Sequence, residues 1–264
     1  MQFIYPGWRC RPGLFFMEDR EFFISLLEDE DESNASIAMK ELLSSGEADD
    51  VIAEYMDTDS PLMRRRIQEL ACISNYRRMK SEFPGRVLDG TLTPWECLSW
   101  INVIMDFRTS LPQLDGMLED YLDGIKPVKG IASFIKMIKD TGIGIDDSCD
   151  HYITKYLLSD VMVHNTGDRL PVAVIIQRLG ELVGWCTQIG TVNGVLCLRD
   201  RHFNFVLITS EMESTLRHVD EAFRPMSIRE IAIEELAKIL SSADIDQIAT
   251  AVADSQELLE RILQ

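Results

Sequence analysis

The stretch that decides the fold is residues 169–207, which read RLPVAVIIQRLGELVGWCTQIGTVNGVLCLRDRHFNFVL. Pro171 suits the first turn of a helix, where its missing N–H costs no hydrogen bond. Apolar residues then recur every three or four positions, which predicts a helix with one buried face. Gly184 is suited to end this helix, because glycine readily adopts the left-handed backbone of a helix terminus. The apolar face consists of Val174, Ile175, Leu179, Leu182 and Val183.

Three short apolar runs come after the helix, at residues 188–192, 194–198 and 203–208. The links between them, VNG at 192–194 and RDR at 199–201, are short, and Asn-Gly favours a tight hairpin turn. We therefore expect a buried helix that leads into a small antiparallel sheet.

The chain before this stretch has a helical pattern. We expect helices over residues 18–28 and 35–44, with Ser33 or Asn34 as the cap of the second. The sequence FPG at residues 83–85 is expected to end this helical part.

A weak internal similarity has a period of 28 residues, because Lys-Glu-Leu at 40–42 returns as Gln-Glu-Leu at 68–70. Each unit reads helix, acidic turn, helix. This pattern is similar to HEAT-like repeats, in which stacked helix pairs bury faces that no single pair covers. A generic helical bundle is the alternative.

Further helices are expected on both sides of the central stretch. Thr93 and Pro94 have the residue types that cap and begin a helix. Residues 123–129 contain Gly124 and Pro127 and form a candidate linker, but the helices before it can pack on the residues after it. We therefore divide the chain into a helical, HEAT-like part at 1–90 and a second part at 91–264. The expected helices cover residues 92–107, 114–122, 128–139, 151–163, 211–223, 228–240 and 244–264.

The composition is that of a globular protein, with 46% hydrophobic and 27% charged residues among 264. No apolar run approaches the about 20 residues that cross a bilayer, and the N-terminus has no signal-peptide pattern. We expect a cytoplasmic protein that does not bind membranes.

The net charge of −18 repels phosphate backbones, so we also expect no nucleic-acid partner. The basic cluster at 64–66 and 77–80 is interpreted as a solvated helix face that balances the acidic run 28–32.

The six cysteines are widely scattered, and no pair has the CxxC spacing of a zinc ribbon. Several lie within apolar segments, so we interpret them as reduced core thiols. The six are Cys10, Cys72, Cys97, Cys149, Cys186 and Cys197.

Three stretches in order resemble the bacterial SirB-type transglutaminase-like family, over roughly residues 95–210. The first is WECLSWINVIMDFRTSLPQLDGMLEDYLDGI at 95–125. The second joins the leucine-rich residues 156–163 to Leu-Pro-Val at 170–172, and the third is residues 179–198. The resemblance implies a papain-like core, mostly α within an α+β fold, with a small antiparallel sheet.

Such a core uses a cysteine at the start of its central helix, a histidine from a following strand and an acidic residue from the next strand. Carried onto this chain, the nucleophile would fall at 171–173, the histidine near Val195 and the acid at 208–210. None of these positions has the required residue type, and the first carboxylate after them is Glu211. The resemblance therefore implies a degenerate member without catalytic residues, cofactor or metal.

Displaced residues could still supply an active site, and Cys186 with His202 is the best pair, on adjacent strands. Cys186 follows the C-terminal end of the helix, however, where the dipole disfavours a thiolate. Cys149, His151 and His164 suggest a metal site, but neighbouring side chains on a helix diverge. The nearby aspartates, Asp146, Asp147 and Asp150, are better interpreted as capping groups.

We therefore expect a non-catalytic binding or scaffold module for a protein or peptide partner, or for a second copy of itself. The alternative is a cysteine-dependent hydrolase or acyltransferase with repositioned residues. A third possibility is an acidic helical scaffold without a groove.

Overall fold

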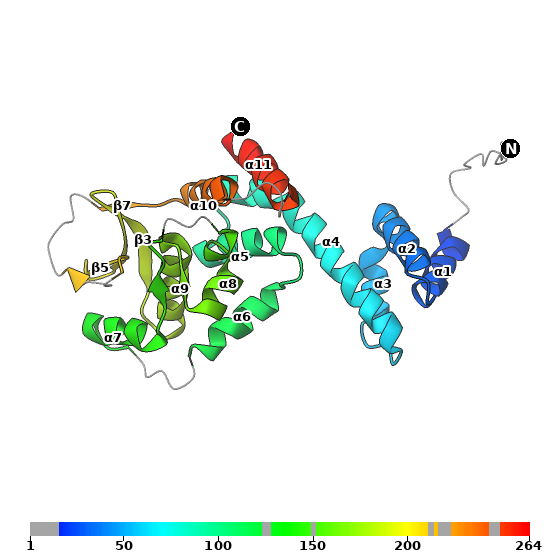
Figure 1. Ribbon diagram of the computed structural model, residues 1–264, viewed down its shortest axis with the longest axis horizontal. Helices are drawn as coiled ribbons and strands as arrows, with labels where there is room; N and C mark the ends of the chain where they lie inside the picture. Colours follow the sequence, from blue (N-terminus) through cyan, green and yellow to red (C-terminus); the bar gives the residue numbers. More distant parts are fainter. Residues whose placement is uncertain (1–15, 123–127, 149–151, 211–213, 216–222, 243–248) are drawn as a thin grey trace. The chain divides into compact units, whose positions relative to one another are not determined.

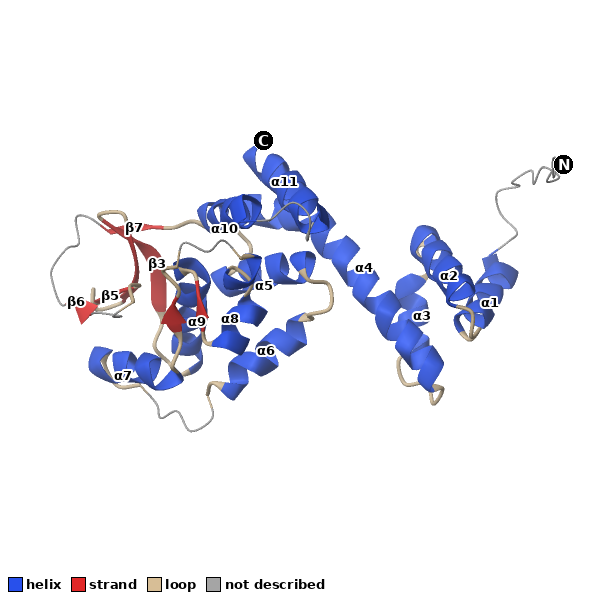
Figure 2. Ribbon diagram, viewed as in Figure 1, coloured by secondary structure: helices blue, strands red, loops and turns tan. Residues whose placement is uncertain are grey.

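A computed structural model of the chain describes residues 16–122, 128–148, 152–210, 214–215, 223–242 and 249–264. They form two compact units that divide between Arg77 and Arg78, within helix α4 (Pro61–Leu88). Both are helical, and the sheet belongs to the second unit (Figure 1 and Figure 2). A separate domain that ends at residue 90 stays a prediction. Among the described helices, none has the length and apolar character needed to span a bilayer.

The first unit contains α1 (Phe16–Leu27), α2 (Glu32–Ser45), α3 (Ala48–Tyr55) and the beginning of α4. The links have the expected acidic turns, so α1 with α2 and α3 with α4 each read helix, turn, helix. Their membership in the HEAT class stays a prediction. The core of the unit includes Leu27, Ala35, Leu42, Val51, Met63 and Leu70.

The start of α2 differs from the expectation that Ser33 or Asn34 caps it. The cap is Asp31, whose Oδ1 accepts a hydrogen bond from the Ser33 amide at 2.8 Å. Asn34 instead donates its side-chain amide to Asp29 Oδ2 at 2.7 Å. The helix thus begins earlier than predicted because the acidic turn itself supplies the capping carboxylate.

The interpretation of residues 64–66 as a solvated basic face is wrong for Arg66, which is only 4% exposed. Its guanidinium lies 3.6 Å from Glu69 and 3.9 Å from Glu32. Arg65 also contacts Glu32, at 3.4 Å, so the expected charge balance with the acidic run is present.

Helix α4 does not end at residues 83–85 but continues to Leu88 with Pro84 inside it. Proline has no N–H for the carbonyl four residues earlier, which here is that of Lys80. Arg261 of α11 (Ala249–Leu263) donates to the Lys80 carbonyl at 3.4 Å and to the Ser81 carbonyl at 3.0 Å. A distant side chain therefore compensates for the break that the local sequence predicts.

Helix α5 (Pro94–Met105) is capped by Thr93 as expected, and Glu96 completes a capping box. Helix α6 (Leu111–Asp120) begins before the predicted residue 114. Ser110 and Gln113 form a second capping box, so Pro112 lies in the first turn, where proline is tolerated.

Helix α7 (Ile131–Thr141) agrees with the prediction for 128–139. The single helix expected over 151–163 is wrong: a short 3-10 turn, η1 (Ile153–Lys155), precedes α8 (Leu158–His164). The Lys155 carbonyl accepts from the Asp168 amide at 2.8 Å, and the Ser159 amide donates to Asn102 Oδ1 at 2.9 Å. These tertiary bonds replace the helical bond between residues 155 and 159.

The central helix and the three predicted strands are confirmed. Helix α9 (Arg169–Leu182) is followed by Gly184 in left-handed backbone, at φ 83°. It leads into β3 (Thr187–Val192), β4 (Val195–Asp200) and β5 (Phe205–Leu207). The β3–β4 turn has positive φ at both central residues, as the Asn-Gly sequence predicts.

Two further strands, β6 (Ser214–Thr215) and β7 (Phe223–Pro225), complete the antiparallel sheet. Its order is β6-β5-β4-β3-β7, and it lies against α9, as Figure 2 shows. On its other sides α9 packs against α5 and α8, and most of its residues are buried. A separate parallel pair joins β1 (Gly144–Ile145) to β2 (Thr166–Gly167) just before α9. The fold is thus α+β and mostly α, with the central helix between the sheet and other helices.

The helix predicted over 211–223 is wrong where it is described. Ser214–Thr215 form β6 and Phe223–Pro225 form β7; the other residues of that range lie outside the described chain. The register pairs Phe223 with Val192 of β3, so sheet pairing overrides the helical pattern. Helix α10 (Ile228–Ser242) comes next, capped by Ser227 as expected.

Candidate functional site

The start of α9 is where the resemblance would place a nucleophile. Pro171, Val172 and Ala173 occupy this position, and all three are buried. Asp168 caps the helix by accepting a hydrogen bond from the Leu170 amide at 3.4 Å. The positive end of the helix dipole thus faces a carboxylate, and no thiol or hydroxyl is present there to be activated.

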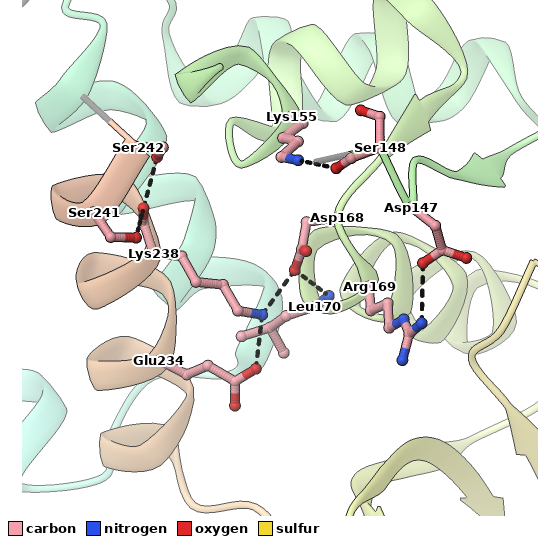
Figure 3. A network of polar contacts seen from close by, with 10 residues as sticks. All are labelled: Asp147, Ser148, Lys155, Asp168, Arg169, Leu170, Glu234, Lys238, Ser241 and Ser242. Atoms are coloured by element: carbon pink, nitrogen blue, oxygen red, sulfur yellow. Dashed lines mark hydrogen bonds and ion pairs between the residues drawn. The ribbon is translucent and has the colours of Figure 1, made fainter. Parts of the chain in front are cut away.

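A lysine from another helix completes this capping group (Figure 3). Lys238 of α10 donates to Asp168 at 2.7 Å and to Glu234 at 2.8 Å. Burial disfavours the charged ammonium, but the attraction of Asp168 and Glu234 outweighs it, so the pKa of Lys238 is raised. The lysine is therefore a permanent cation that ties α10 to the start of α9.

Two further contacts surround the same helix start. Arg169 pairs with Asp147 at 2.9 Å, and Lys155 donates to the carbonyl of Ser148 at 3.1 Å (Figure 3). Asp147 is thus an ion-pair partner rather than a capping group. These charged groups form ion pairs and hydrogen bonds with their neighbours, and the contacts hold Asp147 and helix α10 against the start of α9.

The remaining positions of the implied trio, Val195 and residues 208–210, also lack the implied residue types. Val195 begins β4 and pairs with Val192 across the hairpin. Ile208 is fully buried and donates its amide to the Leu196 carbonyl at 2.9 Å. Glu211 lies outside the described residues. The described part of this region therefore offers neither an imidazole nor a carboxylate at the implied positions.

Cys186 and His202 lie at the same end of the sheet. A pocket of about 40 Å³ brings the exposed Cys186 together with Asp200 and Arg201. The His202 imidazole accepts a hydrogen bond at Nε2 from Arg201 Nε at 3.2 Å, and the His202 amide donates to Asp200 Oδ1 at 2.8 Å. The pocket lining does not include His202, so the structure places the pair near each other without a described contact between thiol and imidazole.

The other sequence candidates concern a metal site and capping aspartates. Cys149, Asp150 and His151 lie outside the described residues, and the described part of the chain contains no metal-binding group of three or more histidine, cysteine or acidic residues. The sequence interpretation expected Asp146 to cap a helix, but it caps no described helix; its Oδ1 accepts a hydrogen bond from the Ser148 amide at 2.8 Å in the segment after β1. The hydrogen bonds from Ser148 lower the pKa of Asp146.

A larger open pocket, of about 430 Å³, lies between the α5–α6 link and α8. Burial raises the pKa of Asp160 in this pocket; the charge of His164 opposes this shift, and the charge of Asp106 adds to it. Val163, which lines the pocket, is 63% exposed. The lining includes Asp106, Thr109, Gln113, Met117, Asp160 and Val163.

The sequence interpretation missed the link between Lys238 and Asp168. Glu234 and Lys238 have the spacing of a pair on one helix face, which is a detectable signal. The third member could not be found in this way, because Asp168 is 70 residues away in sequence. Likewise, nothing in the local pattern of α5 indicates that Asn102 binds Ser159.

Comparisons of the chain with models of protein families, with curated proteins and with solved structures found no match.

Proposed function

We propose that this chain is a non-catalytic binding protein with a degenerate transglutaminase-like core, which holds a protein or peptide partner. The observation that carries the proposal is that the described residues at the three implied positions, 171–173, Val195 and 208–210, include no thiol at the nucleophile position, no imidazole and no carboxylate. The cysteine, histidine and acid of the implied trio are therefore missing from these positions. A scaffold of this kind serves binding rather than bond cleavage.

The pocket beside α8 supplies a place for such a partner. Its volume of about 430 Å³ accommodates a few side chains of a peptide. Val163 offers an exposed apolar contact, while Asp106 and Asp160 offer carboxylates and Arg108 offers a guanidinium. A second copy of the chain is the alternative partner, and its own segments would then occupy the same surface.

The test is a phage-displayed peptide library panned against the intact chain, followed by affinity measurements on enriched peptides. Val163→Glu should weaken binding at least tenfold, because it replaces an apolar contact with a third carboxylate. Leu182→Glu is the matched control, since Leu182 is also an exposed apolar helix residue, at 45% exposure, but lies on α9 away from the pocket lining. The control should bind as the parent chain does.

Self-association is measured in parallel by sedimentation equilibrium of the intact chain. A chain that enriches no peptide and remains monomeric at every concentration would contradict the proposal. Equal loss of binding in V163E and L182E would indicate that the peptide does not bind at this pocket.

A cysteine enzyme is the second candidate, favoured by the exposed Cys186 in its small pocket. Alkylation with iodoacetamide at pH 7, mapped by mass spectrometry, separates the two functions. An activated thiolate would make Cys186 react much faster than a free cysteine in a peptide. We expect an ordinary rate, as for a surface thiol without a described imidazole contact.

A further inference from the structure

The inner side of α10 contains an ionisable group that the α9 network does not use. Glu235 is fully buried, with 0% exposure, whereas its neighbours Ile231, Leu236 and Ile239 are buried as ordinary apolar core. Neither carboxyl oxygen of Glu235 has a hydrogen-bond partner among the described residues. A buried carboxylate without a partner is strongly unfavourable, so this side chain is stable inside the protein only as the neutral acid.

The surroundings of Glu235 explain why no partner neutralises its charge. Helix α10 packs against α5 and α11. From α5 the nearby titratable group is Cys97, which is itself fully buried and whose pKa is raised chiefly by burial. From α11 the buried acid is Asp254, already paired with Lys80 at 2.6 Å.

The remaining neighbours lie towards the start of α9. They are Asp168, Tyr156 and, on α10 itself, Glu234 and Lys238. Lys238 attracts a charge on Glu235, but its described hydrogen bonds go to Asp168 and Glu234. Burial is the dominant influence and raises the pKa of Glu235 well above its usual range, and the two acids raise it further against the opposing effect of Lys238.

We propose that the protonation state of Glu235 controls the packing of α10: the neutral carboxyl permits α10 to pack against α5, and loss of the proton as the pH rises releases α10 from Cys97. The inference stands on the complete burial of Glu235, on its unpaired oxygens and on its place in the α5–α10 contact. It does not depend on which partner the chain binds.

The direction of the effect follows from proton linkage. The released helix binds a proton with the ordinary affinity of glutamate, whereas the closed helix holds it more tightly. Release is therefore least favourable at or below the ordinary pKa, and it becomes more favourable as the pH rises towards the raised pKa. Within that range the equilibrium constant for release increases about tenfold per pH unit.

Cys97 gives a direct measure of release, because its thiol is buried beneath this contact. The intact chain is alkylated with N-ethylmaleimide between pH 5.5 and 9, and the labelled cysteines are mapped by mass spectrometry. At each pH, the labelling rate of Cys97 in the parent chain is divided by its rate in Glu235→Gln. Because both proteins contain the same thiol, this ratio removes the pH dependence of the thiol itself. We expect this ratio to rise by up to about tenfold per pH unit over the range of linkage.

Two controls make the result specific. Cys197 on β4 is also fully buried but lies in the sheet, so its rate ratio should stay constant if α10 alone is released. Glu234→Gln removes a neighbouring carboxylate and should leave the slope of Cys97 labelling unchanged. If Glu235→Gln does not fold, Glu235→Met replaces it, because methionine suits an apolar site of similar length.

Equal Cys97 rates in the parent chain and in the Glu235 variant at every pH would overturn the proposal. A simultaneous rise for Cys97 and Cys197 would also overturn it, because that result would indicate unfolding of the whole unit rather than release of α10.

Discussion

The ionisable side chains on two sides of helix α10 differ in whether they have partners. On the side that faces the start of α9, Lys238 contacts both Asp168 and Glu234 within 2.8 Å. On the side that faces α5, Glu235 has no hydrogen-bond partner among the described residues and is completely buried. Glu234 and Glu235 are adjacent in sequence, yet only one of them is in an ion pair.

The difference arises from the neighbouring helices rather than from the residue types. Asp168 must stand at the start of α9 to cap it, so a carboxylate is available where Lys238 arrives. Helix α5 presents the buried Cys97, which provides no cation for Glu235. Position in the helix register therefore decides whether a charge stabilises the fold or opposes it.

Removal of the cation from the paired side should have the largest effect. We expect Lys238→Met to lower the free energy of unfolding by about 3 kcal/mol, because Asp168 and Glu234 are left close together without their shared partner. Urea unfolding at pH 7 measures the change. Lys139→Met, on an exposed position of α7, is the control and should stay within about 0.5 kcal/mol of the parent chain.

A Lys238→Met variant as stable as the parent chain would remove the contrast between the two sides. That result would mean that solvation by water stabilises the Asp168 carboxylate to the same extent as Lys238 does.

The unpaired side should respond in the opposite direction. We expect Glu235→Met to raise the free energy of unfolding by about 2 kcal/mol at pH 8, because an unsatisfied buried polar group is replaced by an apolar one. The raised pKa of Glu235 makes the parent chain less stable as the pH rises above the ordinary glutamate value, so the gain should shrink towards pH 5.5.

Thermal unfolding of both proteins across this pH range checks the prediction. A gain that is constant with pH would show that Glu235 does not change its protonation state in this range. A loss of stability would show that Glu235 makes a favourable contact in solution.

The sequence predicted the centre of the fold well, because periodicity and turn residues act locally. The apolar pattern of α9, Gly184 after it and Asn193-Gly194 in the hairpin each specify backbone geometry without distant partners. The expected strands at 188–192, 194–198 and 203–208 are confirmed for the same reason, apart from small shifts of their ends.

The errors occur where distant groups replace local hydrogen bonds. The break between η1 and α8 depends on Asn102 and Asp168, which lie far from residues 155–159 in sequence. The strand β7 depends on pairing with β3. Glu235 was detectable in principle, since it stands at an inward position among Ile231, Ala232 and Ile239, but the lack of a partner is a property of the packed helices alone.

The smallest effect is expected at Pro84, where the group that lacks its local partner is a backbone carbonyl instead of a charged side chain. Arg261 donates to the Lys80 and Ser81 carbonyls, at 3.4 and 3.0 Å. The Lys80 carbonyl is the one that receives no helical hydrogen bond, because Pro84 has no N–H. We expect Arg261→Ala to lower the free energy of unfolding by about 1 kcal/mol, the typical value of a hydrogen bond. Glu260→Ala, exposed on the same helix, should have little effect.

A double-mutant cycle then shows what the arginine does. Pro84→Ala restores an N–H to the Lys80 carbonyl, so Arg261→Ala should cost less in that background than in the parent chain. An equal cost in both backgrounds would assign the effect of Arg261 to its ion pair with Glu257, at 3.7 Å, or to packing. A smaller cost would establish that α4 stays helical through Pro84 because α11 supplies the missing donor, just as α10 supplies the missing cation at the start of α9.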